Sequence, residues 1–144
     1  MTPTIRYVKQ LPDKSDLFQL FQTTGWNDFY RLSEPDLHHA FERSWHVMSA
    51  HHREEIIGCG RIICDGVVHA LILDLIVLPA YRNQGIGGKL LDFLVQKCLE
   101  HRIRDIQLFC AKGQVDFYTK RGFYPRPEIA PGMEYRQKDF DKYN

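Results

Sequence analysis

The chain has 144 residues, of which 44% are hydrophobic, and its 19 basic and 18 acidic residues leave a net charge of +1. A chain of this length can bury one hydrophobic core of ordinary size, so we expect a single domain over residues 1–144. The small net charge gives no strong field to attract nucleic acid or an anionic membrane. Neither is therefore expected as a partner, and a small molecule is the more natural one.

Four cysteines are spread along the chain without a C-x-x-C pair or a zinc-type spacing with histidine, so no metal site is predicted. Two pairs of adjacent histidines do not change this, because neighbouring side chains point apart on a helix or a strand. The first residues lack the basic start and apolar run of a signal peptide, and no apolar stretch approaches about 18 residues. We therefore expect a soluble, cytoplasmic protein with reduced thiols.

The hydrophobic pattern at the N-terminal end predicts one strand followed by two helices. Leucine and phenylalanine recur at helical spacing in both helices, and Gly25 stops the first of them. The aromatic residues between the helices either line an acceptor pocket or fill the core. The expected elements are a strand at 4–8, a helix at 14–23, the aromatic stretch with Trp26, Phe29 and Tyr30, and a helix that starts near Ser33 or Glu34 and carries its buried stripe to Trp45.

Beyond the second helix, alternating apolar residues predict three antiparallel strands, with an Asp65-Gly66 turn between the last two. An amphipathic helix, a strand, a short helix and a closing strand follow. The order predicts an α/β fold whose sheet is mixed and mostly antiparallel, flanked by helices. The expected bounds are strands at 45–51, 56–64 and 67–77, a helix at 86–101, a strand at 105–110, a helix at 114–120 and a closing strand near 133–136.

The strand that ends at Val77 leads through a glycine-rich loop into the amphipathic helix. Glycines in this loop let the backbone approach an anion closely, and the first turn of the helix offers unpaired N–H groups and the positive end of its dipole. Two cations flank the loop, and the pattern therefore predicts a pyrophosphate site. Its residues are Arg82, Asn83, Gln84, Gly85, Ile86, Gly87, Gly88 and Lys89.

Three other interpretations of this loop are weaker. A dinucleotide-binding motif would need a third glycine where Leu90 stands, and an acidic residue at the end of the next strand rather than Asp105 at its start. A P-loop is excluded because the Gly-Lys-Ser/Thr sequence is missing. The glycines could also serve a plain strand-to-helix turn.

The segment Arg82-x-x-Gly85-x-Gly87 resembles the acetyl-CoA signature of the GCN5-related N-acetyltransferases, and Phe117-Tyr118-x-x-x-Gly122-Phe123 resembles a later motif of that family. The resemblance covers about 56–123. It implies a single-domain fold with the sheet splayed around acetyl-CoA, whose amide-rich arm pairs with the backbone at Ile76 and Val77.

Two positions depart from the family pattern. Asn83 stands where a glycine is usual in the phosphate loop, and Ala111 stands where many members have asparagine, seven residues before the tyrosine. The first departure should matter little. The second removes a side chain that often touches the coenzyme, so the contacts of the pantetheine arm at this point stay open.

The resemblance implies an N-acetyltransferase that passes the acetyl group of acetyl-CoA directly to a primary amine of a small molecule. Tyr118 would protonate the departing thiolate, and a backbone N–H near Val77 would stabilise the oxyanion. Asp74, a carboxylate within an apolar strand, is a candidate general base; a structural hydrogen bond for Asp74, or water as the base, is the alternative. Tyr118 could also simply pack its ring. Cys110 is a poor candidate nucleophile, because the motif offers it no histidine partner.

Two other classes of function remain open. The chain could acetylate a protein lysine or N-terminus, or it could bind CoA as a regulator without turnover. The acceptor depends on the segment 25–35 and on the tail after Phe123, where no pattern identifies it. Whether the protein forms a homodimer is also left open.

Overall fold

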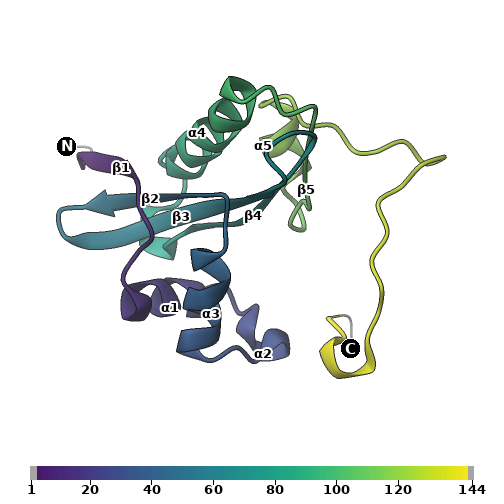
Figure 1. The fold of residues 1–144 in the computed structure, drawn as a ribbon. Coiled ribbons are helices and arrows are strands. Elements are labelled where there is room, and N and C mark those ends of the chain that lie inside the picture. Colours follow the sequence, from purple (N-terminus) through teal and green to yellow (C-terminus); the bar gives the residue numbers. More distant parts are fainter. Residues whose placement is uncertain (1–2, 143–144) are drawn as a thin grey trace.

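The computed structural model describes residues 3–142, which fold in three layers around one sheet (Figure 1). Five strands lie in the order β1-β2-β3-β4-β5, and all neighbours are antiparallel except β4 and β5. The predicted α/β class with a mixed, mostly antiparallel sheet is confirmed. The elements are β1 (Ile5–Lys9), α1 (Lys14–Gln22), α2 (Asn27–Tyr30), α3 (Glu34–Glu42), β2 (His46–His52), β3 (Glu55–Cys64), β4 (His69–Val77), η1 (Pro79–Tyr81), α4 (Ile86–Glu100), β5 (Asp105–Leu108), α5 (Val115–Thr119) and η2 (Lys138–Phe140).

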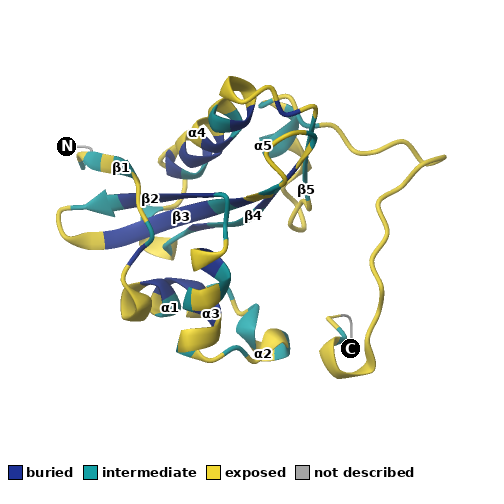
Figure 2. Ribbon diagram, in the orientation of Figure 1, coloured by how far each residue is buried: buried dark blue, intermediate teal, exposed yellow. Residues whose placement is uncertain are grey.

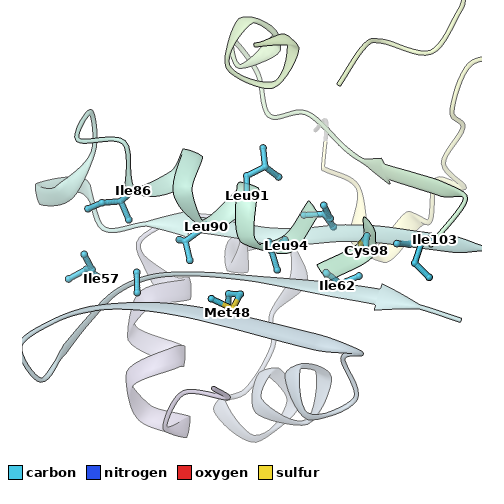
Figure 3. Close-up of a cluster of buried hydrophobic side chains, with 12 residues drawn as sticks. Met48, Ile57, Ile62, Ile86, Leu90, Leu91, Leu94, Cys98 and Ile103 are labelled. Carbon is cyan, nitrogen blue, oxygen red and sulfur yellow. The ribbon is translucent and has the colours of Figure 1, made fainter. Parts of the chain in front are cut away.

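The sheet is covered on both faces by helices that bury apolar stripes. On one face α4 buries Leu90, Leu91 and Leu94 completely, and Leu90 and Leu94 point toward the strands (Figure 3). On the other face α1 and α3 form a second cluster, in which Phe21 and Phe41 are the largest buried side chains. Burial of this kind stabilises the fold by roughly 1.5–3 kcal/mol for each large apolar side chain. The buried residues accordingly follow the strands and the inner faces of these helices (Figure 2).

Short polar side chains fix where the elements begin and turn. The Asp13 carboxylate accepts hydrogen bonds from the first backbone N–H groups of α1, and the Ser33 hydroxyl accepts one from Asp36 at the start of α3 (3.2 Å). The Asp65 carboxylate accepts three backbone N–H groups in the turn between β3 and β4. The predicted start of α3 and the predicted hairpin turn are therefore confirmed.

Three expectations about the elements are wrong. No closing strand forms at 133–136, which lies in an exposed tail. Pro131 and Gly132 precede this stretch, and proline and glycine interrupt or weaken a ladder of backbone hydrogen bonds. Helix α3 ends at Glu42, because the backbone N–H of Trp45 already pairs with the Ile62 carbonyl of β3 (2.9 Å). The aromatic stretch between α1 and α3 forms the short helix α2, which was not expected.

Strand β4 is paired on both sides for only part of its length. Its pairing with β5 runs from His69 to Ile72, whereas its pairing with β3 continues to Val77. The register with β3 shifts at Gly60, which lies opposite both Asp74 and Leu75, and Asp74 has a left-handed φ of 54°. Such a bulge bends the strand and ends regular pairing. The sheet therefore opens between β4 and β5 at this point.

Candidate active site

The open half of β4 presents backbone groups that no strand uses. The N–H of Leu78 donates to the Ile57 carbonyl of β3 (2.8 Å). Because backbone groups alternate in direction along a strand, the N–H and carbonyl of Val77 face away from β3, toward the opening. The carbonyl of Val77 accepts a hydrogen bond from Arg82 Nε at 3.1 Å. A ligand with amide groups could pair with this edge as an added strand does.

The N-terminus of α4 lies directly after this edge and is suited to an anion. Its N-cap, Gly85, has a φ of 82°, and no side chain accepts a hydrogen bond from the first turn. The first intrahelical bond of the loop runs from the Lys89 N–H to the Gly85 carbonyl (3.1 Å), so the preceding N–H groups of 86–88 are available. Asn83 also has a left-handed φ, 62°, which asparagine tolerates better than most residues. This explains how it replaces a glycine.

Gly87 and Gly88 have different surroundings. A Cβ on Gly87 would lie 3.5 Å from Val77 Cγ2 and 3.8 Å from Phe117 Cζ, which is ordinary contact. A Cβ on Gly88 would collide with the guanidinium of Arg121, which lies 4.8 Å from the centre of the Phe117 ring. A side chain at position 88 would therefore displace the Arg121 guanidinium from its place against Phe117. Arg121 stands inside the second motif, and its role has no signal in the local sequence.

The two predicted cations lie on different sides of α4. Arg82 reaches the open edge of β4 through its bond to Val77. Lys89 instead places its ammonium 5.9 Å from the centre of the Tyr7 ring, on β1 at the opposite edge of the sheet from β5. Ile86 is buried in the core, so only its backbone faces an incoming anion. Arg82 is the cation that the structure places beside the opening.

A cavity of about 930 Å³ opens between α2, β4, β5, α5 and the tail. It brings together both predicted catalytic residues, Asp74 and Tyr118, with the aromatic side chains at α2. The carboxylates of Asp28, Glu34 and Asp36, at α2 and the start of α3, do not line it. The aromatic residues that line it from this side are Trp26, Phe29 and Tyr30.

Tyr118 is held by aromatic packing rather than by a hydrogen bond. Its ring makes edge contacts with Phe117 and Phe123, with centroids at 4.9 and 6.2 Å, and its hydroxyl bonds to no other described residue. Burial raises the pKa of Tyr118, and the nearby Cys110 adds a smaller effect in the same direction. The phenol therefore stays protonated at neutral pH, as a proton donor must.

Asp74 is fixed by an arginine of the neighbouring strand. Arg61 Nε donates to Asp74 Oδ2 at 2.7 Å, and both side chains are mostly buried. The guanidinium is itself held over the Phe41 ring and near the Ala40 carbonyl and the Ser44 hydroxyl at the end of α3. One Asp74 oxygen is thus bonded to Arg61, while the residue borders the cavity. Sequence reasoning missed Arg61, because only the strand register brings it to Asp74.

Other features of the described residues offer less chemistry. A hollow of about 360 Å³ lies at the far end of β4, beside the hydrogen bond between His69 Nδ1 and Asp105 Oδ2 (2.9 Å), and none of the predicted site residues lines it. Residues 3–142 contain no cluster of three or more side chains arranged to hold a metal ion. Over the same range, no helix is long and apolar enough to cross a membrane.

The sequence matches the profile described as an acetyltransferase (GNAT) domain over residues 43–125, and the chain belongs to this family. It is 34% identical to histone acetyltransferase TAP1 of Glycine max over 84% of the chain and 56% of that protein. It is 38% identical to GCN5-related N-acetyltransferase 2, chloroplastic, of Arabidopsis thaliana over 59% of the chain and 33% of that protein. The chain thus spans about half or less of these relatives. The predicted family is confirmed.

Solved structures show the same fold. A GNAT-family acetyltransferase of Streptococcus pneumoniae superposes with a TM-score of 0.76 at 28% identity, over 94% of this chain and 99% of the other. The PaiA N-acetyltransferase of Thermoplasma acidophilum, solved in complex with coenzyme A, superposes with a TM-score of 0.70 at 20% identity, over 85% and 91%. The expected cytoplasmic location is overturned by the comparison, because two relatives, GCN5-related N-acetyltransferases 1 and 2 of Arabidopsis thaliana, are named as chloroplastic proteins.

Proposed function

We propose that this protein transfers the acetyl group of acetyl-CoA to a primary amine of a small molecule. The observation that supports this most directly is the arrangement of three features around one opening. The unpaired half of β4 ends beside the uncapped N-terminus of α4, and the cavity next to this half contains both Tyr118 and Asp74. An anion site, an amide-binding edge and a proton donor are the parts that an acetyl-CoA-dependent transfer needs.

The coenzyme would bind along the opening. Its pyrophosphate would accept hydrogen bonds from the N–H groups at 86–88, with Arg82 as the neighbouring cation. A pantetheine amide would pair with the backbone of Val77, on the side that β5 leaves free, whereas the backbone groups of Ile76 point to β3. Arg82 would then have to release the Val77 carbonyl. The space between Val77 and Phe117, which Gly87 leaves open, would accommodate the arm.

The transfer itself would need no covalent enzyme intermediate. The neutral amine nitrogen attacks the thioester carbonyl and forms the new C–N bond, and the Val77 N–H donates to the oxygen that becomes negative. The C–S bond then breaks, and Tyr118 gives its proton to the sulfur. The proton lost by the amine passes to the Asp74 carboxylate or to water. The phenol recovers its proton from solvent.

The acceptor would occupy the cavity between the aromatic residues at α2 and the tail. A small amine fits a cavity of this size better than a lysine on the surface of another protein would. The relative TAP1 carries the name of a histone acetyltransferase, which favours a protein lysine as the second candidate. The two candidates differ in whether free amines are acetylated.

A screen of CoA release tests the proposal. Purified protein with acetyl-CoA would be offered polyamines, arylalkylamines, amino sugars and lysine peptides, and thiol release would be recorded for each. We expect turnover with at least one free amine, and its loss in the Tyr118→Phe variant. Turnover with peptides alone would assign the protein lysine as the acceptor. Tight binding of acetyl-CoA without release in any sample would indicate a CoA-binding regulator.

A further inference from the structure

The loop that leads to the anion site is mostly exposed. Residues 78–85 connect the end of β4 to the first turn of α4, and all of them except Leu78 and Tyr81 are exposed. Asn83 and Gly85 have left-handed φ angles of 62° and 82°. A residue other than glycine keeps such a conformation where surrounding contacts hold it. The contacts of the two less exposed residues therefore determine how firmly the loop is fixed.

Tyr81 connects the loop to a histidine of β2. The Tyr81 hydroxyl and His52 Nδ1 form a hydrogen bond of 2.8 Å, and the two rings are in edge contact with their centroids 5.7 Å apart. The Tyr81 ring also packs against the core cluster that α4 forms with the sheet. In the described part of the chain, the side-chain bonds of Arg82 and Gln84 stay within residues 77–84. The bond to His52 thus joins the loop to a distant part of the sequence.

His52 lies in a strand that is paired on both sides. It stands opposite Ile5 of β1 and Glu55 of β3, so the sheet fixes its backbone. The adjacent His51 has a different partner, because its Nε2 bonds to the Ser49 hydroxyl in the same strand (2.9 Å). The two neighbouring histidines can therefore be told apart by substitution.

We propose that the bond between His52 and Tyr81 holds the loop in the shape that binds the coenzyme, which makes both of them positioning residues. The inference rests on the proposed function, in which the N–H groups at 86–88 bind the pyrophosphate. Arg82, the neighbouring cation, directly follows Tyr81 in the loop. A loop already held in its bound shape loses less conformational freedom when the ligand binds. Neither His52 nor Tyr81 lines the cavity that contains Tyr118, so the bond serves binding and not the transfer step.

A double-mutant cycle on CoA affinity tests this inference. Tyr81→Phe removes the hydroxyl and keeps the ring, and His52→Phe removes the ring nitrogens but keeps an aromatic ring beside Tyr81. His52→Asn keeps a hydrogen-bonding atom close to the position of Nδ1. The matched control is His51→Phe, the same substitution at the adjacent residue, whose side chain bonds to Ser49. Calorimetry with CoA gives Kd, steady-state kinetics give KM and kcat, and circular dichroism gives the melting temperature.

We expect Tyr81→Phe and His52→Phe each to weaken CoA binding by about three- to tenfold. The double variant should bind no more weakly than the weaker single variant, and His52→Asn should recover most of the affinity. The KM for acetyl-CoA should rise in parallel, while kcat at saturating acetyl-CoA changes by less than about twofold. His51→Phe should keep the wild-type Kd, even if its melting temperature falls.

Three results would overturn the inference while leaving the proposed function intact. They are wild-type CoA affinity in all variants, additive losses in the double variant, and an equal loss in His51→Phe. A fall in kcat without a change in affinity would overturn it as well, because the pair would then act on the transfer step. A wild-type protein that binds no CoA would instead contradict the proposed function, and the inference with it.

Discussion

The two halves of β4 differ in how their backbone is used. Residues 70–72 pair with β3 on one side and β5 on the other, whereas residues 73–77 pair with β3 alone. The bulge at Asp74 marks the change. The paired half contributes to the stability of the sheet, and the unpaired half leaves donors and acceptors for a ligand. One strand can therefore serve the fold and a binding site, because a single irregular residue separates the two parts.

The largest effect is expected at the anion site next to the unpaired half. Gly87→Glu places a carboxylate where the pyrophosphate is expected, so it adds repulsion and blocks charge-assisted hydrogen bonds. Calorimetry should show acetyl-CoA affinity lowered by at least about 10³-fold. Gly87→Ala is the control, because a Cβ at this position meets only ordinary contacts, and it should keep the melting temperature. Unchanged affinity in the glutamate variant would show that the pyrophosphate does not bind at this position.

The next effect concerns the proton donor across the opening. Tyr118→Phe removes one hydroxyl that bonds to no other described residue and keeps the ring between Phe117 and Phe123. We expect kcat to fall by about 10²-fold with little change in stability or in acetyl-CoA affinity. Because burial raises the pKa of Tyr118, the midpoint of the loss of the donor by ionisation should lie above the ordinary tyrosine value of 10.0. A fall in kcat of less than about fivefold would show that Tyr118 only packs its ring and is not the proton donor.

The ion pair between Arg61 and Asp74 lies at the boundary between the two halves of β4, and substitutions can test how much it stabilises the fold. Arg61→Met leaves the Asp74 carboxylate mostly buried without its partner and should lower the free energy of unfolding by about 2–3 kcal/mol, measured by denaturant titration. The double variant Arg61→Met/Asp74→Asn removes the unpaired charge and should recover part of this loss, since asparagine tolerates the left-handed backbone. An additive loss in the double variant would mean that the two residues act separately.

The smallest effect separates the two cations beside α4. Arg82→Ala should weaken CoA binding by about fivefold at low salt and should reduce the dependence of affinity on ionic strength. Lys89→Ala should change affinity by less than about twofold, because the ammonium lies over Tyr7 at the other edge of the sheet. Titrations at low and physiological salt would measure both. Equal losses would show that Lys89 turns toward the anion when CoA binds.

Local patterns were enough to predict most of the fold and the glycine loop. The Asp65 turn, the start at Ser33 and the loop before α4 each depend on residues close in sequence. The pair of Arg61 with Asp74 depends instead on a register shift between two strands, which no single segment encodes. The closing strand expected at 133–136 is absent for a local reason, because Pro131 and Gly132 precede it and such residues interrupt or weaken a ladder of backbone hydrogen bonds.

The central claim is that CoA binds along the unpaired half of β4 and at the N-terminus of α4. Backbone amide spectra of labelled protein, recorded by NMR with and without CoA, test it directly. We expect large shifts at the amides of Val77, Gly87 and Gly88, and small ones at Ala70 and Ile72 in the paired half. Shifts that spare the first three amides, or that affect both halves of β4 equally, would contradict the claim.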